Sequence, residues 1–222
     1  MSLTQPNPQE IQRLLKPYLG AKAPGRADVS ADWDRICGQL AVYLDLILKW
    51  NARINLTAIR DPEEIVRRHF GESLFAGLHL EAGGSNMEPC DSLLDLGSGA
   101  GFPGIPIQLL RPELKVTLAE SRTRKAAFLR EAVRTLGLST EVWADRAEAM
   151  APEWRFHTVA LRAVDDMSSA VAEAARRASR QILILGTVDQ PEFLSLGREF
   201  DLGLPTLLPN SSQGALLVAT RR

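Results

Sequence analysis

The glycine-rich stretch from Asp95 to Gly101, Asp-Leu-Gly-Ser-Gly-Ala-Gly, constrains this chain more than any other segment. It closes an apolar run at residues 92–96 that has the length and composition of a buried strand. A second apolar run ends at Glu120, 23 positions after Gly97. A strand, a glycine loop, a helix, a second strand and an acidic residue follow in this order in sites for adenosine-containing cofactors. The chain is therefore expected to form an α/β fold around such a site.

The spacing of the glycines separates two classes of cofactor. The dinucleotide fingerprint Gly-x-Gly-x-x-Gly requires its third glycine at position 102, which is Phe102. The glycines instead alternate at positions 97, 99 and 101, a pattern that favours S-adenosylmethionine over NAD. Two interpretations stay open: a cofactor site, or a tight strand-to-helix turn near an unrelated surface acid.

Strands and helices are predicted to alternate from residue 91 onward. Apolar runs predict strands at residues 92–96, 115–119, 140–144, 158–161, 181–185 and 215–220. Helical periodicity predicts helices near residues 103–110, 122–136 and 167–178. This alternation indicates a mostly parallel sheet with helices on both faces. A further run at residues 193–202 fits a closing hairpin with the last strand. We predict a doubly wound, seven-stranded Rossmann-like sheet whose last strand runs antiparallel.

The N-terminal third is predicted to be helical. Apolar residues recur there at helical spacing and form one face: Ile36, Leu40, Tyr43, Ile47 and Trp50. A second helix is predicted from Asp61, a candidate N-cap, toward Leu78. Glycine, serine and proline predict a loop at residues 80–89. The expected organisation is a helical extension at residues 1–88 and one compact cofactor-binding domain at residues 89–222.

Composition limits the classes of protein to consider. Hydrophobic residues make up 45% of the chain, enough for a sizeable core, and the formal net charge is -1. Any surface that binds nucleic acid must therefore be a local patch. Cys37, Cys90 and three scattered histidines form no disulfide or metal-ligand pattern, so we expect no bound metal. No apolar run approaches the ~20 residues of a membrane span, and no secretory signal is recognisable, so a cytoplasmic protein is expected.

The glycine loop and the acid have predicted roles in binding. Gly97, Gly99 and Gly101 allow backbone amides to approach a ligand where a Cβ would collide. Glu120 is expected to accept hydrogen bonds from two ribose hydroxyls. Asp95 either orients the loop or meets the ammonium group of a methionyl moiety.

Two later segments are predicted at the same edge of the sheet. The backbone at Ala147 and Glu148, after the third strand, either contacts an adenine base or is a solvated helix N-terminus. Arg162 ends the fourth strand. It either positions the substrate or contacts a phosphate, unless it forms a local ion pair with Asp165 or Asp166.

Two groups of basic residues are candidates for contact with a phosphate backbone. The first group lies on the helix after the second strand: Arg122, Arg124, Lys125, Arg130 and Arg134. The second group precedes the first strand: Arg53, Arg60, Arg67 and Arg68. The alternative for either group is an ordinary solvated face. His69, next to the second group, is predicted to be a packed, hydrogen-bonded histidine rather than a catalyst.

Missing motifs narrow the reaction. No Pro-Pro-Tyr or Pro-Pro-Phe triplet is present, so the usual apparatus for methylating exocyclic amines is absent. Neither cysteine lies after a predicted strand, which disfavours the covalent route to carbon-5 of a pyrimidine. No lysine follows Lys125, which disfavours lysine-dependent ribose methylation. A ring nitrogen with a free lone pair, such as guanine N7, remains, because the enzyme then mainly aligns donor and acceptor.

These motifs resemble those of the bacterial small-subunit ribosomal RNA guanine-N7 methyltransferases, the glucose-inhibited division protein B family. The most specific block is Asp95–Pro106, in which Pro-Gly-Ile-Pro extends the glycine loop. The other matching segments are Trp50-Asn51, Asn55–Ala58, Arg60–Pro62, Arg68–Phe70, Arg111-Pro112, Phe128–Arg130, Arg146–Glu148 and Arg162-Ala163. The resemblance covers residues 40–190.

The resemblance implies a site, a reaction and a partner. It implies cofactor contacts at Gly97, Phe102, Ala147, Glu148 and Arg162, with Arg162 also a candidate for positioning the substrate. It implies methyl transfer from S-adenosyl-L-methionine to N7 of a guanine in the 530 loop of 16S rRNA, in the small ribosomal subunit or an assembly intermediate. It assigns no general base. We expect a monomer, with Phe102 either a wall of the base pocket or part of the core.

Three rival functions stay open at this stage. The first is an S-adenosylmethionine-dependent methyltransferase for another RNA or a small molecule, which weak, salt-insensitive RNA binding would favour. The second is a non-catalytic RNA-binding module with a relic cofactor fold, which donor binding without methyl transfer would favour. The third is a nicotinamide oxidoreductase, which stabilisation by NAD would favour.

Overall fold

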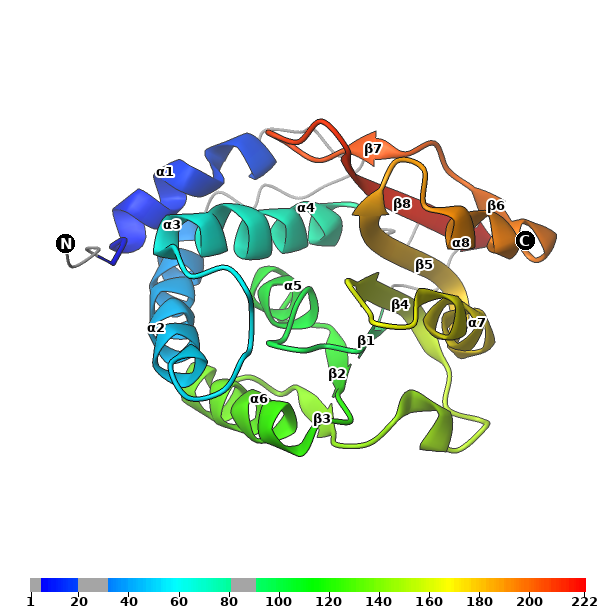
Figure 1. The fold of residues 1–222 in the computed structure, drawn as a ribbon, viewed down its shortest axis with the longest axis horizontal. Coiled ribbons are helices and arrows are strands. Elements are labelled where there is room, and N and C mark those ends of the chain that lie inside the picture. The colour runs from blue at the N-terminus through cyan, green and yellow to red at the C-terminus, as the bar shows by residue number, and fades with distance from the viewer. Residues whose placement is uncertain (1–4, 20–31, 81–90) are drawn as a thin grey trace.

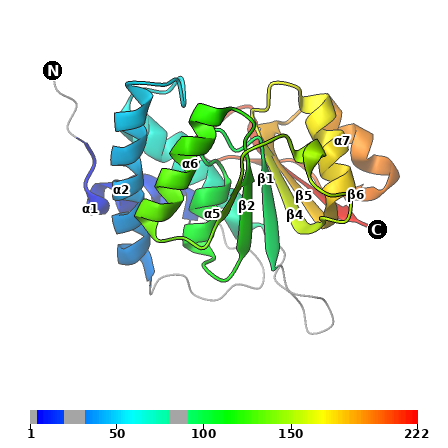
Figure 2. The ribbon, with the colours of Figure 1, turned by 90° about the horizontal axis from the view of Figure 1, so that it is seen from below.

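The computed structural model describes residues 5–19, 32–80 and 91–222. The predicted boundary between residues 88 and 89 lies outside these ranges, as does the predicted loop apart from Leu80. A central sheet lies between two layers of helices (Figure 1, Figure 2). None of the helices in the described ranges is long and apolar enough to cross a membrane.

The sheet has eight strands in the order β3-β2-β1-β4-β5-β8-β6, with β7 paired to β8. The strands are β1 (Ser92–Leu96), β2 (Lys115–Ala119), β3 (Glu141–Trp143), β4 (Phe156–Arg162), β5 (Ala178–Thr187), β6 (Phe200–Leu202), β7 (Thr206–Leu207) and β8 (Gly214–Arg221). Strands β1 to β5 pair in parallel, and β8 pairs antiparallel with β5, β6 and β7. The predicted parallel sheet with an antiparallel last strand is confirmed. It has eight strands rather than seven because the short strands β6 and β7 both pair with β8.

Side chains of the central strands point alternately to the two faces of the sheet. Leu93 and Leu118 join the core under α5 (Gly104–Leu110) and α6 (Thr123–Leu136). Their neighbours Leu94 and Ala119 join the core under α7 (Met167–Arg177) and α8 (Pro191–Leu194). Because helices bury both faces, the central strands are nearly continuous apolar runs, which is why the sequence pattern located them.

The N-terminal helices are α1 (Pro8–Leu19), α2 (Trp33–Asn51), α3 (Pro62–Glu64), the π-helix η2 (Ile65–Gly71) and α4 (Glu72–Leu78). The predicted N-cap is confirmed, because Asp61 Oδ1 accepts a hydrogen bond from the Glu64 amide at 2.8 Å. The helix that follows runs to Leu78 as predicted, but its middle turns are π-helical rather than α-helical.

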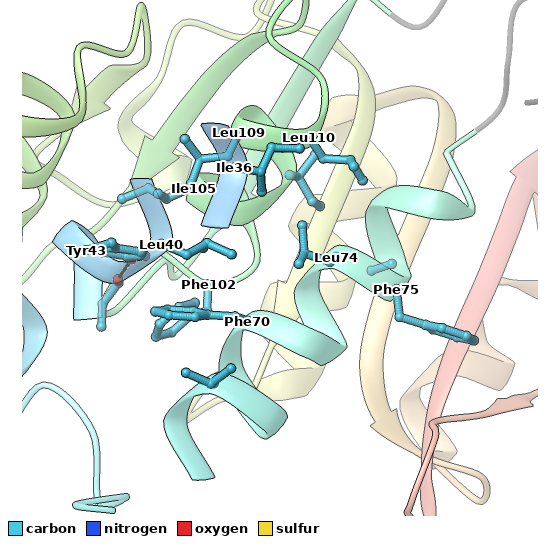
Figure 3. Packing of buried hydrophobic residues seen from close by; sticks show 14 of the residues in the cluster. Ile36, Leu40, Tyr43, Phe70, Leu74, Phe75, Phe102, Ile105, Leu109 and Leu110 are labelled. Atoms are coloured by element: carbon cyan, nitrogen blue, oxygen red, sulfur yellow. Dashed lines mark hydrogen bonds between the residues drawn. The ribbon is translucent and has the colours of Figure 1, made fainter. Parts of the chain in front are cut away.

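These helices share a hydrophobic core with one face of the sheet. Tyr43 of α2, Phe70 of η2 and Phe102 of the glycine loop meet there (Figure 3). The ring centroids of Tyr43 lie 5.4 Å from those of Phe70 and 5.7 Å from those of Phe102. The N-terminal helices therefore pack against the glycine loop at Phe102 and hold this part of the loop in place.

Candidate cofactor site

A cavity of about 340 Å³ opens at the carboxyl ends of β1 to β4. Its lining comes from the segments that follow these strands: Gly97 after β1, Glu120 after β2, Ala147 and Glu148 after β3, and Val164 after β4. The strand order reverses between β1 and β4. Doubly wound sheets bind ligands at such a reversal, and the volume lies in the range of small-molecule sites.

Only part of the predicted site lines this cavity. The predicted residues that line it are Gly97, Glu120, Arg122, Lys125, Ala147 and Glu148. The predicted cofactor-binding residues that do not are Asp95, Gly99, Gly101, Phe102 and Arg162, and the basic candidates that do not are Arg60, Arg67, Arg68 and Arg124. Sequence analysis missed one side of the cavity, formed by Asp166, Ser169 and Ala170 at the start of α7. The available signal was Asp166, an N-cap whose side chain accepts a hydrogen bond from the Ser169 amide at 3.1 Å.

The glycine loop depends on left-handed backbone conformations. The φ angles are 74° at Gly97, 60° at Gly99 and 88° at Gly101. A Cβ at Gly101 would lie 2.5 Å from the Ile105 side chain and 2.6 Å from the Tyr43 hydroxyl. Both the conformation and the packed core therefore require glycine at this position.

Glu120 holds two backbone segments at the edge of the cavity. Its Oε2 accepts a hydrogen bond from the Gly99 amide at 3.0 Å, and its Oε1 accepts one from the Arg122 amide at 2.7 Å. The Gly97 amide donates to the Ala119 carbonyl at 3.0 Å. These loop amides bond within the protein, so the glycines shape the loop rather than present free donors. Each Glu120 oxygen keeps a lone pair that a ligand hydroxyl can use.

Asp95 lies behind the glycine loop and is fully buried. Its Oδ2 accepts a hydrogen bond from the Gly104 amide at 2.9 Å, and its carbonyl accepts one from the Ser98 hydroxyl at 2.8 Å. Its Oδ1 has no hydrogen-bond partner among the described residues. Burial raises the pKa of Asp95 to about 7. In this position the side chain orients the loop and the start of α5, and it does not reach the cavity described above.

Phe102 and His69 form a stacked pair in the core next to the loop. Phe102 is 6% exposed, and its ring centroid lies 4.6 Å from that of His69. His69 Nδ1 lies 2.6 Å from a guanidinium nitrogen of Arg162, which can only donate, so Nδ1 accepts. Nε2 therefore carries the proton and donates to the Thr57 hydroxyl at 2.7 Å. Burial, together with the positive charge of Arg162, lowers the pKa of His69 to about 3, so it is neutral at physiological pH.

Arg162 joins the end of β4 to the N-terminal helices. Its guanidinium donates to Glu72 Oε2 at 2.7 Å and to the Arg68 carbonyl at 3.1 Å. Burial lowers the pKa of Arg162, and the charge of Glu72 opposes that shift. The predicted alternative of a local ion pair with Asp165 or Asp166 is wrong, because Arg162 pairs with Glu72 instead and Asp165 pairs with Arg122.

The two basic groups differ in how much of their charge is already paired. In the first group, Arg122 pairs with Asp165 at 2.7 Å, Lys125 lines the cavity and Arg124 is exposed. Three of the four residues of the second group are engaged by nearby acceptors, and the fourth, Arg53, is exposed: Arg67 pairs with Glu63, Arg68 with Glu64 and Glu72, and Arg60 donates to the Asn51 carbonyl and the Asn55 side chain. Positive charge next to the cavity therefore comes mainly from α6.

The cavity matches the chemistry of a nucleoside-containing donor. Glu120 offers acceptors for hydroxyl groups, the segment at Ala147 and Glu148 offers backbone, and Leu96, Ala119 and Ala170 add apolar surface.

Comparison with known proteins assigns the family. The profile of the family described as GidB, rRNA small subunit methyltransferase G, matches residues 36–195. A relative from Nitrosomonas europaea, named Ribosomal RNA small subunit methyltransferase G, is 39% identical over 180 residues, which are 78% of this chain and 80% of the relative. A protein of the same name from Pseudomonas paraeruginosa is 37% identical over 166 residues, which are 73% and 74% of the two chains.

Solved structures share the fold at low sequence identity. A ribosomal protein L11 methylase from Lactobacillus delbrueckii subsp. bulgaricus has a TM-score of 0.54 at 11% identity and covers 70% of this chain and 79% of its own. A geranyl diphosphate methyltransferase solved with GPP and sinefungin has a TM-score of 0.56 at 16% identity, with 72% and 80% covered. These likenesses agree with the doubly wound sheet predicted from the alternation of strands and helices. From the match over residues 36–195, the chain belongs to the rRNA small subunit methyltransferase G family.

Proposed function

We propose that this chain transfers a methyl group from S-adenosyl-L-methionine to N7 of a guanine in the 530 loop of 16S rRNA. The observation that carries the proposal is the anchored Glu120 carboxylate in the cavity at the β1/β4 reversal, in a chain of this family. A carboxylate that accepts one hydrogen bond at each oxygen from backbone amides keeps lone pairs for two ribose hydroxyls, which supports the proposal.

Each proposed contact uses residues whose positions are described above. Glu120 binds the ribose, and the backbone at Ala147 and Glu148 lies against the adenine. S-adenosylmethionine supplies a methyl group on a sulfonium, which is a good leaving group. Guanine N7 has a lone pair that needs no base to release it, so the protein has to align the ring with the methyl group and exclude competing geometries. Arg162, at the end of β4, is the candidate for this alignment.

The proposed partner is 16S rRNA in the small subunit or an assembly intermediate, met by a monomeric, cytoplasmic enzyme. Arg122, Arg124 and Lys125 would contact its phosphates, because they begin α6 directly next to the cavity. The second group, which includes Arg60, Arg67 and Arg68, would extend the same contact.

Two measurements test the proposal. N7-methylguanine is mapped in rRNA from cells with and without this gene. The purified enzyme is then assayed on small subunits isolated from the cells without the gene. We expect the modification in the 530 loop to require the gene. Unchanged modification in the deletion strain, together with no activity on any rRNA substrate, would refute the proposal in favour of a small-molecule substrate.

A matched pair of variants tests whether the Glu120 carboxylate binds the methyl donor. Glu120→Gln is expected to weaken donor binding about tenfold or more, because one of its acceptors becomes a donor that faces a backbone N–H. Glu141→Gln, an exposed acid at the start of β3, is the control and should bind the donor as the wild type does. Equal donor affinity in both variants would remove Glu120 from the site.

A further inference from the structure

We propose that Arg177 is a positioning residue for the cofactor site: its guanidinium holds in place the turn that forms the adenine side of the cavity. The proposal rests on the proposed function, because it assigns the adenosine half of the donor to that side. Neither the glycine motif nor the basic groups pointed to this residue. Arg177 is the last residue of α7 and is 5% exposed.

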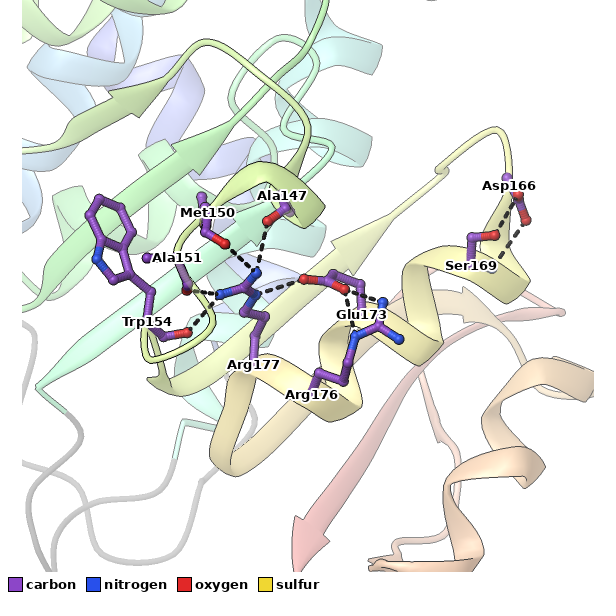
Figure 4. A network of polar contacts seen from close by, with 9 residues as sticks. All are labelled: Ala147, Met150, Ala151, Trp154, Asp166, Ser169, Glu173, Arg176 and Arg177. Atoms are coloured by element: carbon purple, nitrogen blue, oxygen red, sulfur yellow. Dashed lines mark hydrogen bonds and ion pairs between the residues drawn. The ribbon is translucent and has the colours of Figure 1, made fainter.

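The guanidinium of Arg177 uses all five of its N–H groups within the protein (Figure 4). Nη1 donates to the Ala151 carbonyl at 2.6 Å and to the Trp154 carbonyl at 3.1 Å. Nη2 donates to the Ala147 carbonyl at 3.1 Å and to the Met150 carbonyl at 3.0 Å. Nε donates to Glu173 Oε1 at 2.6 Å.

The four carbonyls belong to one irregular segment, residues 147–154, between β3 and β4. Its only regular element is the short helix η3 (Ala147–Ala149). Few of its backbone groups bond to one another: the amides of Ala149, Met150 and Trp154 donate within the segment or to Arg146. The Ala147 and Ala151 carbonyls each accept one of these amides and one N–H of Arg177, and the Met150 and Trp154 carbonyls accept, among the described residues, only from Arg177, so a single planar cation links all four carbonyls.

The segment and α7 both line the cavity. Ala147 lines the cavity at the start of the segment, and Ala170 lines it at the start of α7. Both are buried in the same apolar cluster. Arg177, at the C-terminal end of α7, donates a hydrogen bond to the Ala147 carbonyl. This contact links the two sides of the cavity, the segment at Ala147 and helix α7, to each other. A displaced turn would change the space for the adenine ring without touching the methyl group.

Glu173 keeps the guanidinium in the required orientation. Burial raises the pKa of Glu173, but hydrogen bonds from Arg177 and Arg176 outweigh burial and hold that pKa below its usual value. Arg176 binds the same carboxylate, yet its side chain is 65% exposed and it donates to none of the four carbonyls. Arg176 is therefore a matched control, because it pairs with Glu173 as Arg177 does but makes none of the hydrogen bonds to the carbonyls of residues 147–154.

The variants Arg177→Lys and Arg176→Lys test the proposal with two ligands, S-adenosylmethionine and 5′-methylthioadenosine, which keeps the adenosine half and lacks the amino acid. We expect Arg177→Lys to weaken binding of both ligands by the same factor, about tenfold, because an ammonium has three donors and no fork. The maximal rate at saturating donor and the KM for the RNA substrate should stay within about twofold of the wild type, as for a positioning role. Arg176→Lys should match the wild type in every measurement.

Other results would overturn the proposal. Wild-type affinity for 5′-methylthioadenosine in a folded Arg177→Lys protein would show that the brace does not shape the adenine side. A loss confined to the maximal rate would place Arg177 in the chemical step instead. If the wild type binds neither ligand, the proposed function itself fails, which is a distinguishable result.

Hydrogen exchange on the wild type gives a readout that needs no variant. If Arg177 braces the turn, the amides of Ala149, Met150 and Trp154 should be as protected without ligand as those at the end of α7. Fast exchange of these amides in the free protein, slowed only by 5′-methylthioadenosine, would show a wall that the ligand itself orders and would contradict the proposal.

Discussion

Arg162, which is partly buried, and Arg177, which is buried, both pair with glutamates, but they bond to the protein to different extents. Arg177 donates all five N–H groups, to acceptors between 4 and 30 residues away in the chain. Arg162 donates three N–H groups to described residues, all 90 to 94 positions away in the N-terminal helices. The other two N–H groups of Arg162 have no acceptor in the described ranges.

The difference separates two uses of the same side chain. A guanidinium whose donors are all filled by the fold can brace a segment but has nothing left for a ligand. A guanidinium with free donors, oriented by a few strong partners, is ready to meet a carboxylate or a phosphate. We infer that Arg177 supports the cofactor site and that Arg162 stays available for donor or substrate.

The largest effect on stability is expected at Glu173. The side chains of Glu173 and Arg177 are 2% and 6% exposed, so Glu173→Gln leaves a buried guanidinium without its counter-charge. Removing one partner of such a pair costs about 3–5 kcal/mol of unfolding free energy. Urea denaturation followed by circular dichroism measures it, with Glu131→Gln on α6 as the control. A loss below about 1 kcal/mol would mean that the carbonyls alone stabilise Arg177.

Glu72→Gln is expected to cost less, about 2–3 kcal/mol, because Glu72 and Arg162 are each 12% exposed and keep some hydration. The double variant Glu72→Leu with Arg162→Met removes both charges and should recover most of this loss. Methyl transfer should not recover, since the free donors of Arg162 are gone. Recovery of activity together with stability would show that Arg162 serves only the fold.

The contrast between these arginines also marks the limit of sequence analysis. Local patterns predicted the strands, the Asp61 cap and Arg162 at the end of β4, because each depends on periodicity or on neighbouring residues. The partner of Arg162 lies 90 positions earlier in the chain, so it depends on packing between distant segments, which leaves no local signal. The role of Arg177 was missed for the same reason, since a run of Ala-Arg-Arg resembles any helix C-terminus.

The surroundings of Arg162 and those of Arg177 should also differ in how the free energy of unfolding depends on pH. Near Arg162, the pKa of Asp95 is raised and that of His69 is lowered, whereas next to Arg177 the pKa of Glu173 is lowered. In the folded state Asp95 keeps its proton up to about pH 7. Its contribution to the free energy of unfolding therefore falls as pH rises from about 4 to 7. His69 stays neutral down to about pH 3, so its contribution is complete above its unfolded pKa of 6.5 and is lost as pH falls.

The two contributions change the free energy of unfolding in opposite directions between about pH 4 and 6.5, so they should largely cancel in the wild type. A variant that removes one of the two groups should show the pH dependence of the other. In His69→Gln the unfolding free energy should fall with rising pH, and in Asp95→Asn it should rise, each by at most about 1.4 kcal/mol per pH unit. Denaturation at about pH 4.5, 5.5 and 6.5 measures both slopes. Parallel profiles for the two variants would contradict the assigned protonation states.

The smallest effect on stability is expected on the surface, where the same distinction between filled and free donors predicts RNA binding. Arg124 is exposed, and no ion pair or side-chain hydrogen bond engages it in the described ranges, whereas Arg67 pairs with Glu63 at 2.6 Å. Either change to alanine should cost less than about 1 kcal/mol of unfolding free energy. Arg124→Ala should nevertheless weaken binding to the small subunit and lower the slope of log affinity against log salt by about 1, because one phosphate contact is lost. Arg67→Ala should change that slope less, since Glu63 already offsets its charge. If the two variants change the slope equally, pairing within the protein does not decide which arginines meet the RNA.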